Sequence, residues 1–264
     1  MGVATRERFA EVVRRDPVDV GLACALIAAV ADPAVDPAGS LLDLDALAGA
    51  SRATVAAAPT PAEGLRVALG VQAGFSGYAE DSAELRASLL PDVVERRRGL
   101  PVLLSVVWVE VARRLGLDAG CIGLPGHVIA TVAGELCDPW YGGRLLTGHD
   151  AADRVRASGL AFSARMLTPM SPGDLLTRVL ANIRHLDART LAPINALWAT
   201  ELTLLLPRHP LGLRREHGDL LVRTGQYDAG ARQLETYADA IEVAEPTVAR
   251  AARDAARMSR ARLS

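Results

Sequence analysis

The chain has 264 residues, of which 50% are hydrophobic and 23% charged, so it can bury the core of one large domain or two ordinary ones and is not a disordered tail. Its 29 basic residues nearly balance 31 acidic ones, and a formal net charge of −2 predicts no nucleic-acid partner. Every basic residue is arginine, since the sequence contains no lysine, which excludes Schiff-base lysine chemistry, P-loops and protein kinases.

Cysteine usage and hydropathy argue against a secreted or membrane-spanning protein. The three cysteines, Cys24, Cys121 and Cys137, cannot all pair and do not form the disulfide framework of a secreted domain. The most apolar early run, 21–31, is too short to cross a bilayer, and the acidic residues before it are unlike a signal peptide. We expect this run to be a buried helix, and the protein to be cytoplasmic with no membrane partner.

The first zone, 1–92, is rich in alanine and has helical periodicity interrupted by prolines. Asp16-Pro17 is expected to start a second helix, and Asp32-Pro33 with Asp36-Pro37 to form a turn. Two further helices are predicted at 43–57 and 61–74. No residue pattern in this zone points to chemistry, so we expect it to pack on the core that follows.

The second zone, 93–170, begins with a helix predicted at 101–115, opened by a proline and ended by Gly116. This helix is apolar on nearly every side, which indicates complete burial. Three strands follow, the last two joined by the turn Ala133-Gly134. The strands are predicted at 120–124, 127–132 and 135–138. A buried helix followed by an antiparallel meander is an α+β arrangement.

The third zone, 171–264, is helical again. Helices are predicted at 172–189, at 194–206 and in a final set over 214–261. The final set alternates small and large residues in a way that lets two antiparallel helices pack closely, as in a tetratricopeptide unit. These residues are Gly218, Leu221, Gly225, Tyr227, Gly230 and Leu234. Because one such unit cannot stand alone, we expect it to dock on the preceding domain.

Two residues of the meander form the strongest candidate pair for chemistry. His127 begins one predicted strand and Asp138 ends the next, so pairing of these strands brings the two side chains close together. A carboxylate behind an imidazole fixes the tautomer of the ring and raises its basicity. In the alternative interpretation, His127 caps a loop and Asp138 starts an Asp-Pro turn.

Several motifs around this pair resemble one known family. They are ERRRGLP at 95–101, RRLG at 113–116, GLPGH at 123–127, DPW at 138–140 and the glycines Gly142 and Gly143. Together they resemble the SirB1-type family of the transglutaminase-like superfamily, which commonly carries a C-terminal tetratricopeptide-like segment. The resemblance covers most of 80–245.

The resemblance implies a papain-like core in which Cys, His and Asp follow in chain order and the Cys begins a buried helix. His127 then matches the catalytic His and Asp138 the orienting Asp, but Pro101 stands at the position of the Cys. Ordinary thiol-based acyl transfer should therefore be absent. The motifs also give a set of candidate binding residues, namely Arg98, Gly99, Pro101, Gly126, Trp140, Gly142 and Gly143. No cofactor is predicted.

None of the cysteines is well placed to replace the missing thiol. Cys121 lies six residues before His127 on an extended stretch, on the order of 20 Å away unless the chain folds back. Cys137 should face away from Asp138, because neighbouring strand residues point to opposite faces, and Cys24 is interpreted as a core residue. Ser105, one turn after Pro101, is a tentative nucleophile, although a helical serine more often bonds to a carbonyl of its own helix.

No metal site is predicted. A metal at the candidate pair would need a third ligand, and the nearest, His149, falls in what looks like a solvated turn. The remaining histidines, His185, His209 and His217, have no paired ligand spacing. The basic run 96–98 is expected to pair with Glu95 or another carboxylate, with an anionic ligand before the helix as the alternative.

Two functions follow from these observations. The first is a non-catalytic, protein-binding or scaffolding role with a protein or peptide partner, on a transglutaminase-like core that Pro101 disables. The alternative is a hydrolase or amide-bond acyltransferase of altered chemistry on a peptide-like substrate, with His127 as acid or base, Asp138 orienting it, and Ser105, water or the substrate as nucleophile. In a third, plainer interpretation these residues only hold the meander together.

Overall fold

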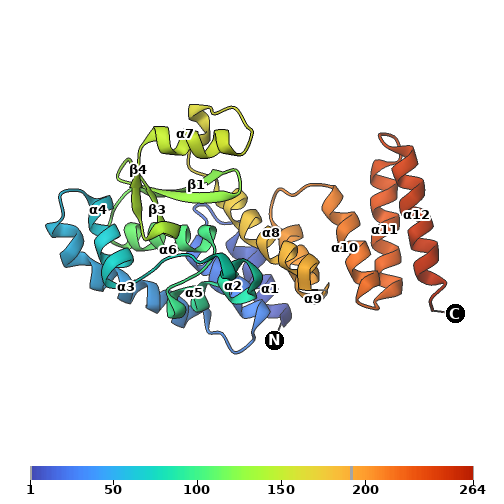
Figure 1. Ribbon diagram of the computed structural model, residues 1–264. Helices are drawn as coiled ribbons and strands as arrows, with labels where there is room; N and C mark the ends of the chain where they lie inside the picture. Colours follow the sequence, from blue (N-terminus) through green and yellow to red (C-terminus); the bar gives the residue numbers. More distant parts are fainter. Residues whose placement is uncertain (1, 191–192, 264) are drawn as a thin grey trace. The chain divides into compact units, whose positions relative to one another are not determined.

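The computed structural model describes residues 2–190 and 193–263. The chain divides into two compact units, Met1–Val179 and Leu180–Ser264. The first unit combines helices with a four-stranded antiparallel sheet, and the described part of the second contains helices alone (Figure 1). The predicted α+β class is confirmed, with helical segments before and after the sheet.

The first unit begins with four helices, two of which are capped by an aspartate. They are α1 (Gly2–Val12), α2 (Val20–Ala31), α3 (Pro37–Ala57) and α4 (Pro61–Leu65). Asp19 caps α2 by accepting a hydrogen bond from the Leu22 N–H, 2.8 Å away, so the predicted start at Asp16-Pro17 was wrong. Asp36 caps α3 and Pro37 occupies its first turn, so this dipeptide begins a helix instead of completing a turn.

The single helix predicted at 61–74 is a short α-helix followed by a π-helix, η1 (Arg66–Gln72). A π-helix is wider than an α-helix and is often found at functional sites. Three short elements then lead to the central helix. They are η2 (Ala79–Ala83), η3 (Leu85–Ser88) and α5 (Leu90–Arg96).

The central helix and the meander agree with prediction. The helix is α6 (Pro101–Arg114), and the strands are β1 (Ala119–Leu124), β2 (His127–Val132), β3 (Glu135–Asp138) and β4 (Arg144–Leu146). Residues 102–112 of α6 are all buried, as a helix without a polar face requires. Only β4 was not predicted, because three residues after a glycine pair carry too short an alternation to indicate a strand.

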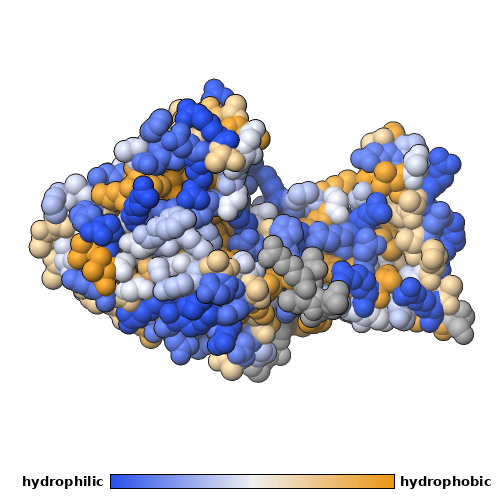
Figure 2. Space-filling model, viewed as in Figure 1, coloured by the Kyte–Doolittle hydropathy of each residue, from blue (hydrophilic) through white to orange (hydrophobic). Residues whose placement is uncertain are grey.

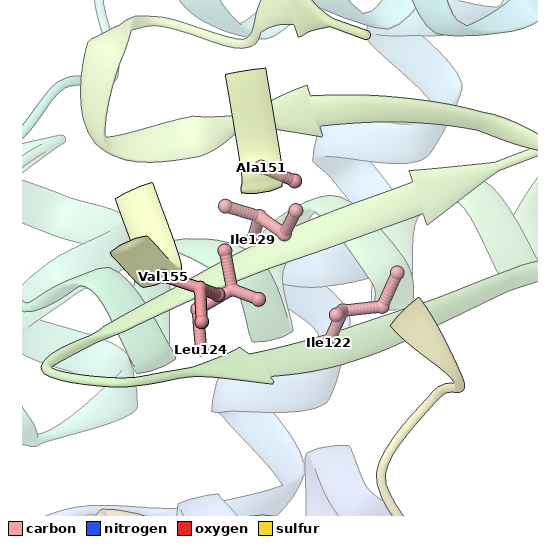
Figure 3. Close-up of a cluster of buried hydrophobic side chains, with 5 residues drawn as sticks. All are labelled: Ile122, Leu124, Ile129, Ala151 and Val155. Atoms are coloured by element: carbon pink, nitrogen blue, oxygen red, sulfur yellow. The ribbon is translucent and has the colours of Figure 1, made fainter. Parts of the chain in front are cut away.

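The sheet has strand order β1-β2-β3-β4, and helices cover both of its faces (Figure 1). Ile122, Leu124 and Ile129 pack on one face against α7 (Gly148–Ala157), as Figure 3 shows. The opposite face carries Cys121, which lines a small cavity with residues of α6. The candidate pair therefore lies at one end of a sheet that is enclosed between α6 and α7.

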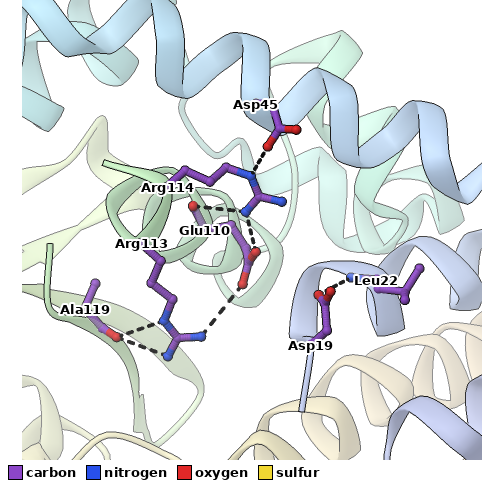
Figure 4. Close-up of polar contacts among 7 residues, drawn as sticks. All are labelled: Asp19, Leu22, Asp45, Glu110, Arg113, Arg114 and Ala119. Carbon is purple, nitrogen blue, oxygen red and sulfur yellow. Dashed lines mark hydrogen bonds and ion pairs between the residues drawn. The ribbon is translucent and has the colours of Figure 1, made fainter. Parts of the chain in front are cut away.

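A buried polar cluster anchors the last turn of α6 (Figure 4). Glu110 is buried and accepts a hydrogen bond from Arg114 at 2.6 Å, while Arg114 also binds Asp45 at 2.7 Å. The guanidinium of Arg113 donates two hydrogen bonds to the Ala119 carbonyl, at 3.1 and 3.3 Å. The far end of α6 is thus fixed to α3 and to the start of β1.

The second unit is built from close helix packing. Helix α8 (Pro172–Thr190) begins in the first unit and is followed in the second unit by α9 (Pro193–Leu205). Three further helices come after α9. They are α10 (Gly212–Arg223), α11 (Tyr227–Ile241) and α12 (Pro246–Arg260). A Cβ atom on Gly218 would lie 2.8 Å from Cγ of Leu234, so α10 and α11 approach as the predicted spacing of small and large residues requires.

Within residues 2–190 and 193–263, no helix combines the length and the apolar character that crossing a membrane requires. On the face shown in Figure 2, hydrophobic side chains are interrupted by hydrophilic ones.

Candidate functional site

His127 and Asp138 meet at the end of the sheet. Asp138 follows Cys137, which pairs with Ala130, so Asp138 and His127 point to the same face. Nε2 of His127 lies 2.9 Å from each carboxylate oxygen of Asp138. Both side chains are buried, with exposed fractions of 6% and 0%. The predicted proximity is confirmed, while a catalytic role stays a prediction.

Asp138 binds two further donors. The backbone N–H of Trp140 donates to its Oδ1 at 3.1 Å, and the guanidinium of Arg154 on α7 donates to its Oδ2 at 3.4 Å. An ionised carboxylate can only accept hydrogen bonds, so Nε2 of His127 carries the proton that it shares with Asp138. The lone pair of the imidazole is then on Nδ1, the nitrogen that has no partner among the described residues.

Two side-chain contacts set the position of α6 relative to β2. Oγ of Ser105 donates to the Val128 carbonyl at 3.2 Å, near the start of β2. At the other end of α6, Arg113 binds Ala119, which pairs with Val132 at the end of β2. The helix therefore runs in the same direction as β2, and its first turn lies toward the end of β2 that bears His127. Pro101 is the first residue of that turn.

Ser105 is a tether between α6 and β2. Its side chain is fully buried, and its one hydroxyl proton is donated to Val128 and not to a carbonyl of its own helix. The bond reaches across 23 residues of sequence, which no local pattern reports. A nucleophilic role for Ser105 stays a prediction.

The three cysteines are buried and unpaired. Burial raises the pKa of the Cys121 and Cys137 thiols to about 12, and it raises the pKa of the Cys24 thiol as well. In the sheet register Cys121 and Cys137 both flank Ala130, on the face opposite to Asp138, so the predicted orientation of Cys137 is confirmed. Neutral thiols on the far face are poor nucleophiles for a reaction at His127.

The loop after Asp138 is held by two glycines of the N-terminal zone. A Cβ atom on Gly77 would lie 1.9 Å from the ring of Trp140, and the Gly77 N–H donates to the Trp140 carbonyl at 2.9 Å. A Cβ atom on Gly70, in the π-helix, would lie 1.9 Å from the carbonyl oxygen of Gly142. Only glycine permits both approaches. The N-terminal zone therefore contributes directly to the site.

The predicted binding glycines also have structural tasks. Gly143 has a φ of +80° and donates its N–H to the Asp138 carbonyl at 2.9 Å. Gly126, with a φ of +66°, belongs to the two-residue turn that precedes His127. Gly99 is buried, and a Cβ atom there would lie 2.5 Å from a methyl carbon of Val93. All three maintain the backbone around the candidate pair.

Two arginines of the run before α6, Arg96 and Arg98, pair with carboxylates, as expected, although the partners are not Glu95, and Arg97 donates to the Ala73 carbonyl. Nε of Arg98 donates to the fully buried Asp81 at 2.9 Å, and its guanidinium lies 4.4 Å from the ring centroid of Tyr78. Arg96 pairs with Glu84 at 2.7 Å. Asp81 gave no sequence signal because it lies 17 residues from Arg98.

The remaining histidines do not join the candidate pair. His149 is exposed on α7 and pairs with Asp153 at 3.2 Å. Within the described part of the chain, no group of three His, Cys, Asp or Glu side chains is arranged to hold a metal ion. His185, His209 and His217 belong to the second unit.

Sequence analysis missed two arginines near His127. Arg154 reaches Asp138 from α7, and Arg178 on α8 donates hydrogen bonds to the carbonyls of Leu124 and His127 at 2.8 and 2.9 Å. Both lie on helices where a charged residue normally faces solvent. No local pattern distinguishes them from the other arginines of the chain.

The site geometry can be set beside known proteins. Residues 40–181 match the family described as the transglutaminase-like superfamily. The chain is 33% identical over 202 residues to the UPF0162 protein PA3419 of Pseudomonas aeruginosa, which is 73% of each chain. It is 30% identical over 175 residues to a UPF0162 protein of Xylella fastidiosa, strain Temecula1, which is 62% of each chain. No solved structure matches. This chain, in which His127 and Asp138 meet at the end of the sheet, belongs to the transglutaminase-like superfamily and, within it, to the UPF0162 proteins.

Proposed function

We propose that this protein binds a protein or peptide partner without catalysing acyl transfer through a thiol. The observation that carries the proposal is Pro101 at the first position of α6, where the resemblance places the reacting cysteine. Proline offers neither a nucleophile nor a backbone N–H. The three cysteines are buried, and the raised pKa of Cys121 and Cys137, about 12, keeps their thiols neutral at physiological pH.

Exposed aromatic side chains beside the candidate pair support the binding role. Tyr78 follows Gly77 beneath the Trp140 ring, and Tyr141 follows Trp140; their exposed fractions are 46% and 57%. The guanidinium of Arg154 lies 5.9 Å from the ring centroid of Tyr141, and Arg98 lies over Tyr78. Aromatic and arginine side chains contribute most of the binding energy at many protein interfaces. We place the partner on this surface, defined by Tyr78, Trp140 and Tyr141.

The assignment of Pro101 can be tested by restoring a thiol there. We expect iodoacetamide at pH 6 to alkylate the Pro101→Cys variant at least tenfold faster than a Leu160→Cys control, whose position is exposed. The resemblance places residue 101 within reach of the His127 imidazole, and an imidazole beside a thiol favours the thiolate. The additional change His127→Ala should remove the acceleration. Equal alkylation of the two cysteines would show that Pro101 does not occupy the nucleophile position.

Binding can be tested with random linear peptides displayed on phage, followed by anisotropy titration of a selected peptide. We expect Tyr141→Ala to weaken binding at least tenfold and the control Leu160→Ala, at another exposed apolar position, to leave it unchanged. His127→Ala should largely retain binding. A folded His127→Ala protein that binds none of the selected peptides would contradict the non-catalytic role.

The intact His127–Asp138 pair favours one alternative, a hydrolase acting on a peptide-like substrate. In this reaction Nδ1 of His127 takes a proton from a water molecule or from Ser105 as the oxygen attacks the peptide carbonyl, and Asp138 stabilises the imidazolium. The imidazolium then gives this proton to the amide nitrogen as the C–N bond breaks and the amine leaves. If Ser105 attacks, a water molecule hydrolyses the resulting ester by the same proton transfers. A pool of internally quenched peptides tests it. Cleavage that is lost in His127→Ala but kept in Ser105→Ala would support attack by water, and loss in both would support Ser105. No cleavage above a no-protein control would contradict the alternative.

We also propose that the chain is of the SirB1 type, that its C-terminal helices form a tetratricopeptide-like unit, and that it acts in the cytoplasm. The motifs around His127 and Asp138 support the first point. The close approach of Gly218 to Leu234 supports the second, since tetratricopeptide helices pack through small residues. The three unpaired cysteines support the third, because free thiols persist in a reducing compartment.

A further inference from the structure

The start of β2, which bears His127, lacks support from β3. The pairing of β2 with β3 covers Ala130, Thr131 and Val132 only, because the chain turns away after Asp138. The first three residues of β2 therefore rely on β1 and on side chains from elsewhere. Ser105 supplies one such contact by donating to the Val128 carbonyl.

Arg178 supplies the other contact. Its Nη2 donates to the carbonyls of Leu124 and His127, at 2.8 and 2.9 Å. These two residues pair with each other across the turn Pro125-Gly126, so one nitrogen holds both ends of the turn. The turn directly joins Leu124, the last residue of β1, to His127.

Gly123 leaves room beside β1 for the side chains of Arg178 and Met170. A Cβ atom on Gly123 would lie 2.8 Å from the sulfur of Met170, which would have to shift, and 3.5 Å from Nη1 of Arg178, which is van der Waals contact. The N–H of Met170 donates to the Cys121 carbonyl at 2.8 Å, which holds the segment before α8 against the edge of β1. Arg178 thus reaches the turn from a segment that is itself attached to the sheet.

The charge of Arg178 is not balanced by a carboxylate within the described part of the chain. Burial lowers its pKa, and no neighbouring acidic group opposes this effect. Arg113 offers a comparison, since it binds the Ala119 carbonyl at the other end of β1 but also lies 3.8 Å from Glu110. Removing a cation from water costs desolvation free energy, and two neutral carbonyls offset this less well than a carboxylate would. This points to a role of Arg178 beyond stability.

We propose that Arg178 is a positioning residue for His127: it fixes the turn from which the imidazole extends, so that Nε2 stays on Asp138 and Nδ1 stays available. The proposal rests on the proposed function in one respect, namely the hydrolase alternative, in which Nδ1 of His127 takes a proton. Ser105 and Arg178 together replace the hydrogen bonds that β3 does not supply. The imidazole is then oriented by Asp138 through its side chain and by Arg178 through its backbone.

The test is the tautomer and proton exchange of His127 in the full chain, read from two-bond hydrogen–nitrogen spectra of protein labelled with nitrogen-15 histidine. The His127 signals are assigned by their absence from a His127→Gln variant. We expect Arg178→Met to speed exchange of the Nε2 proton at least tenfold and to average the two tautomers. The matched control Arg113→Met, which removes a similar contact at the far end of β1, should leave the His127 spectrum unchanged.

Wild-type His127 spectra in a folded Arg178→Met protein would overturn the proposal. If that variant does not fold, Arg178→Lys decides, because lysine keeps the charge but its shorter side chain does not carry the nitrogen as far as the two carbonyls. We then expect exchange at least threefold faster than in the wild type, and an unchanged rate contradicts the proposal. No peptide is used, so failure here leaves the proposed function intact, whereas failure of the peptide titration leaves the assignment of Arg178 intact.

Discussion

At the scale of single residues, the site depends on one shared acceptor. The buried carboxylate of Asp138 receives hydrogen bonds from His127, from the Trp140 N–H and from Arg154. An ionised carboxylate satisfies several donors at once because it has two oxygens and no proton to place. The imidazole of His127, the loop and α7 therefore depend on the same two atoms.

Replacing Asp138 by asparagine should destabilise the protein. Asparagine carries no charge and presents one oxygen, so His127 and Arg154 lose the acceptor that they share. We expect the free energy of unfolding in urea to fall by about 2–4 kcal/mol. The control Asp153→Asn removes an exposed carboxylate that pairs with Arg156 and should cost less than about 1 kcal/mol. Equal losses in the two variants would contradict a shared-acceptor role.

The buried thiols should make stability depend on alkaline pH. The pKa of Cys137 is about 12 in the folded protein, whereas the ordinary value of a cysteine thiol, 9.0, applies in the unfolded chain. The unfolded chain therefore loses this proton first as the pH rises. The contribution of the neutral Cys137 thiol to the free energy of unfolding is complete below pH 9 and is lost as the pH approaches 12. At pH 10.5 the loss should be about 2 kcal/mol. Urea unfolding at pH 8 and pH 10.5 measures the loss. Cys137→Ala should show a smaller loss than the wild type, and the same loss in both would refute this pKa shift.

At the scale of elements, the loop after β3 is held by a close approach of backbones. Gly77 lies beneath the Trp140 ring, and Gly70 allows the π-helix to contact the carbonyl of Gly142. These contacts connect η1 to the loop that follows Asp138, far apart in sequence. The N-terminal zone, for which sequence analysis predicted packing alone, thus supports one wall of the site.

A methyl group at Gly77 should disrupt this wall. The added carbon would lie 1.9 Å from an atom of the Trp140 ring, which is rigid and cannot bend aside. We expect Gly77→Ala to lower the free energy of unfolding by at least about 2 kcal/mol. The control Gly49→Ala lies within α3 with nothing within 4 Å and should raise stability by up to about 1 kcal/mol. Thermal or urea unfolding measures both, and a neutral Gly77→Ala would contradict the close approach.

The secondary-structure elements and the candidate pair could be predicted where residues close together in the sequence determine them. A proline at its start and glycine at its end mark the helix of Pro101, and the turn Ala133-Gly134 fixes the register that joins His127 to Asp138. Capping misled the prediction at Asp16, because the residue that caps α2 is Asp19, which precedes Val20 and not a proline. Arg154 and Arg178 act across long separations from helix faces, and such contacts leave no periodic pattern in a single sequence.

At the scale of the whole molecule, helix α8 belongs to both units. The first unit ends at Val179 and the family match at residue 181, yet α8 continues to Thr190. Its first half buries three aliphatic residues in the first unit, namely Leu175, Leu176 and Val179. A boundary drawn at the start of this helix would remove part of the core of the first unit.

Truncation can test the role of α8. A fragment ending at residue 186 keeps Leu175, Leu176, Arg178 and Val179, whereas a fragment ending at residue 170 loses them all. We expect the shorter fragment to be less stable by about 5 kcal/mol, from the lost burial of three aliphatic side chains. Urea unfolding of both fragments gives the difference. Equal stabilities would mean that the first half of α8 is not part of the core of the first unit.

Because the ion pairs at Asp81, Asp138 and Glu110 all use arginine in a chain without lysine, no side chain presents a primary amine. Amine-directed dyes and cross-linkers therefore have no side-chain target anywhere in the protein. A single lysine introduced at Arg144, which is 67% exposed on β4 next to the end of the sheet, would be a unique chemical handle. A cross-linker attached there would report which molecule occupies the neighbouring surface, without background from other side chains.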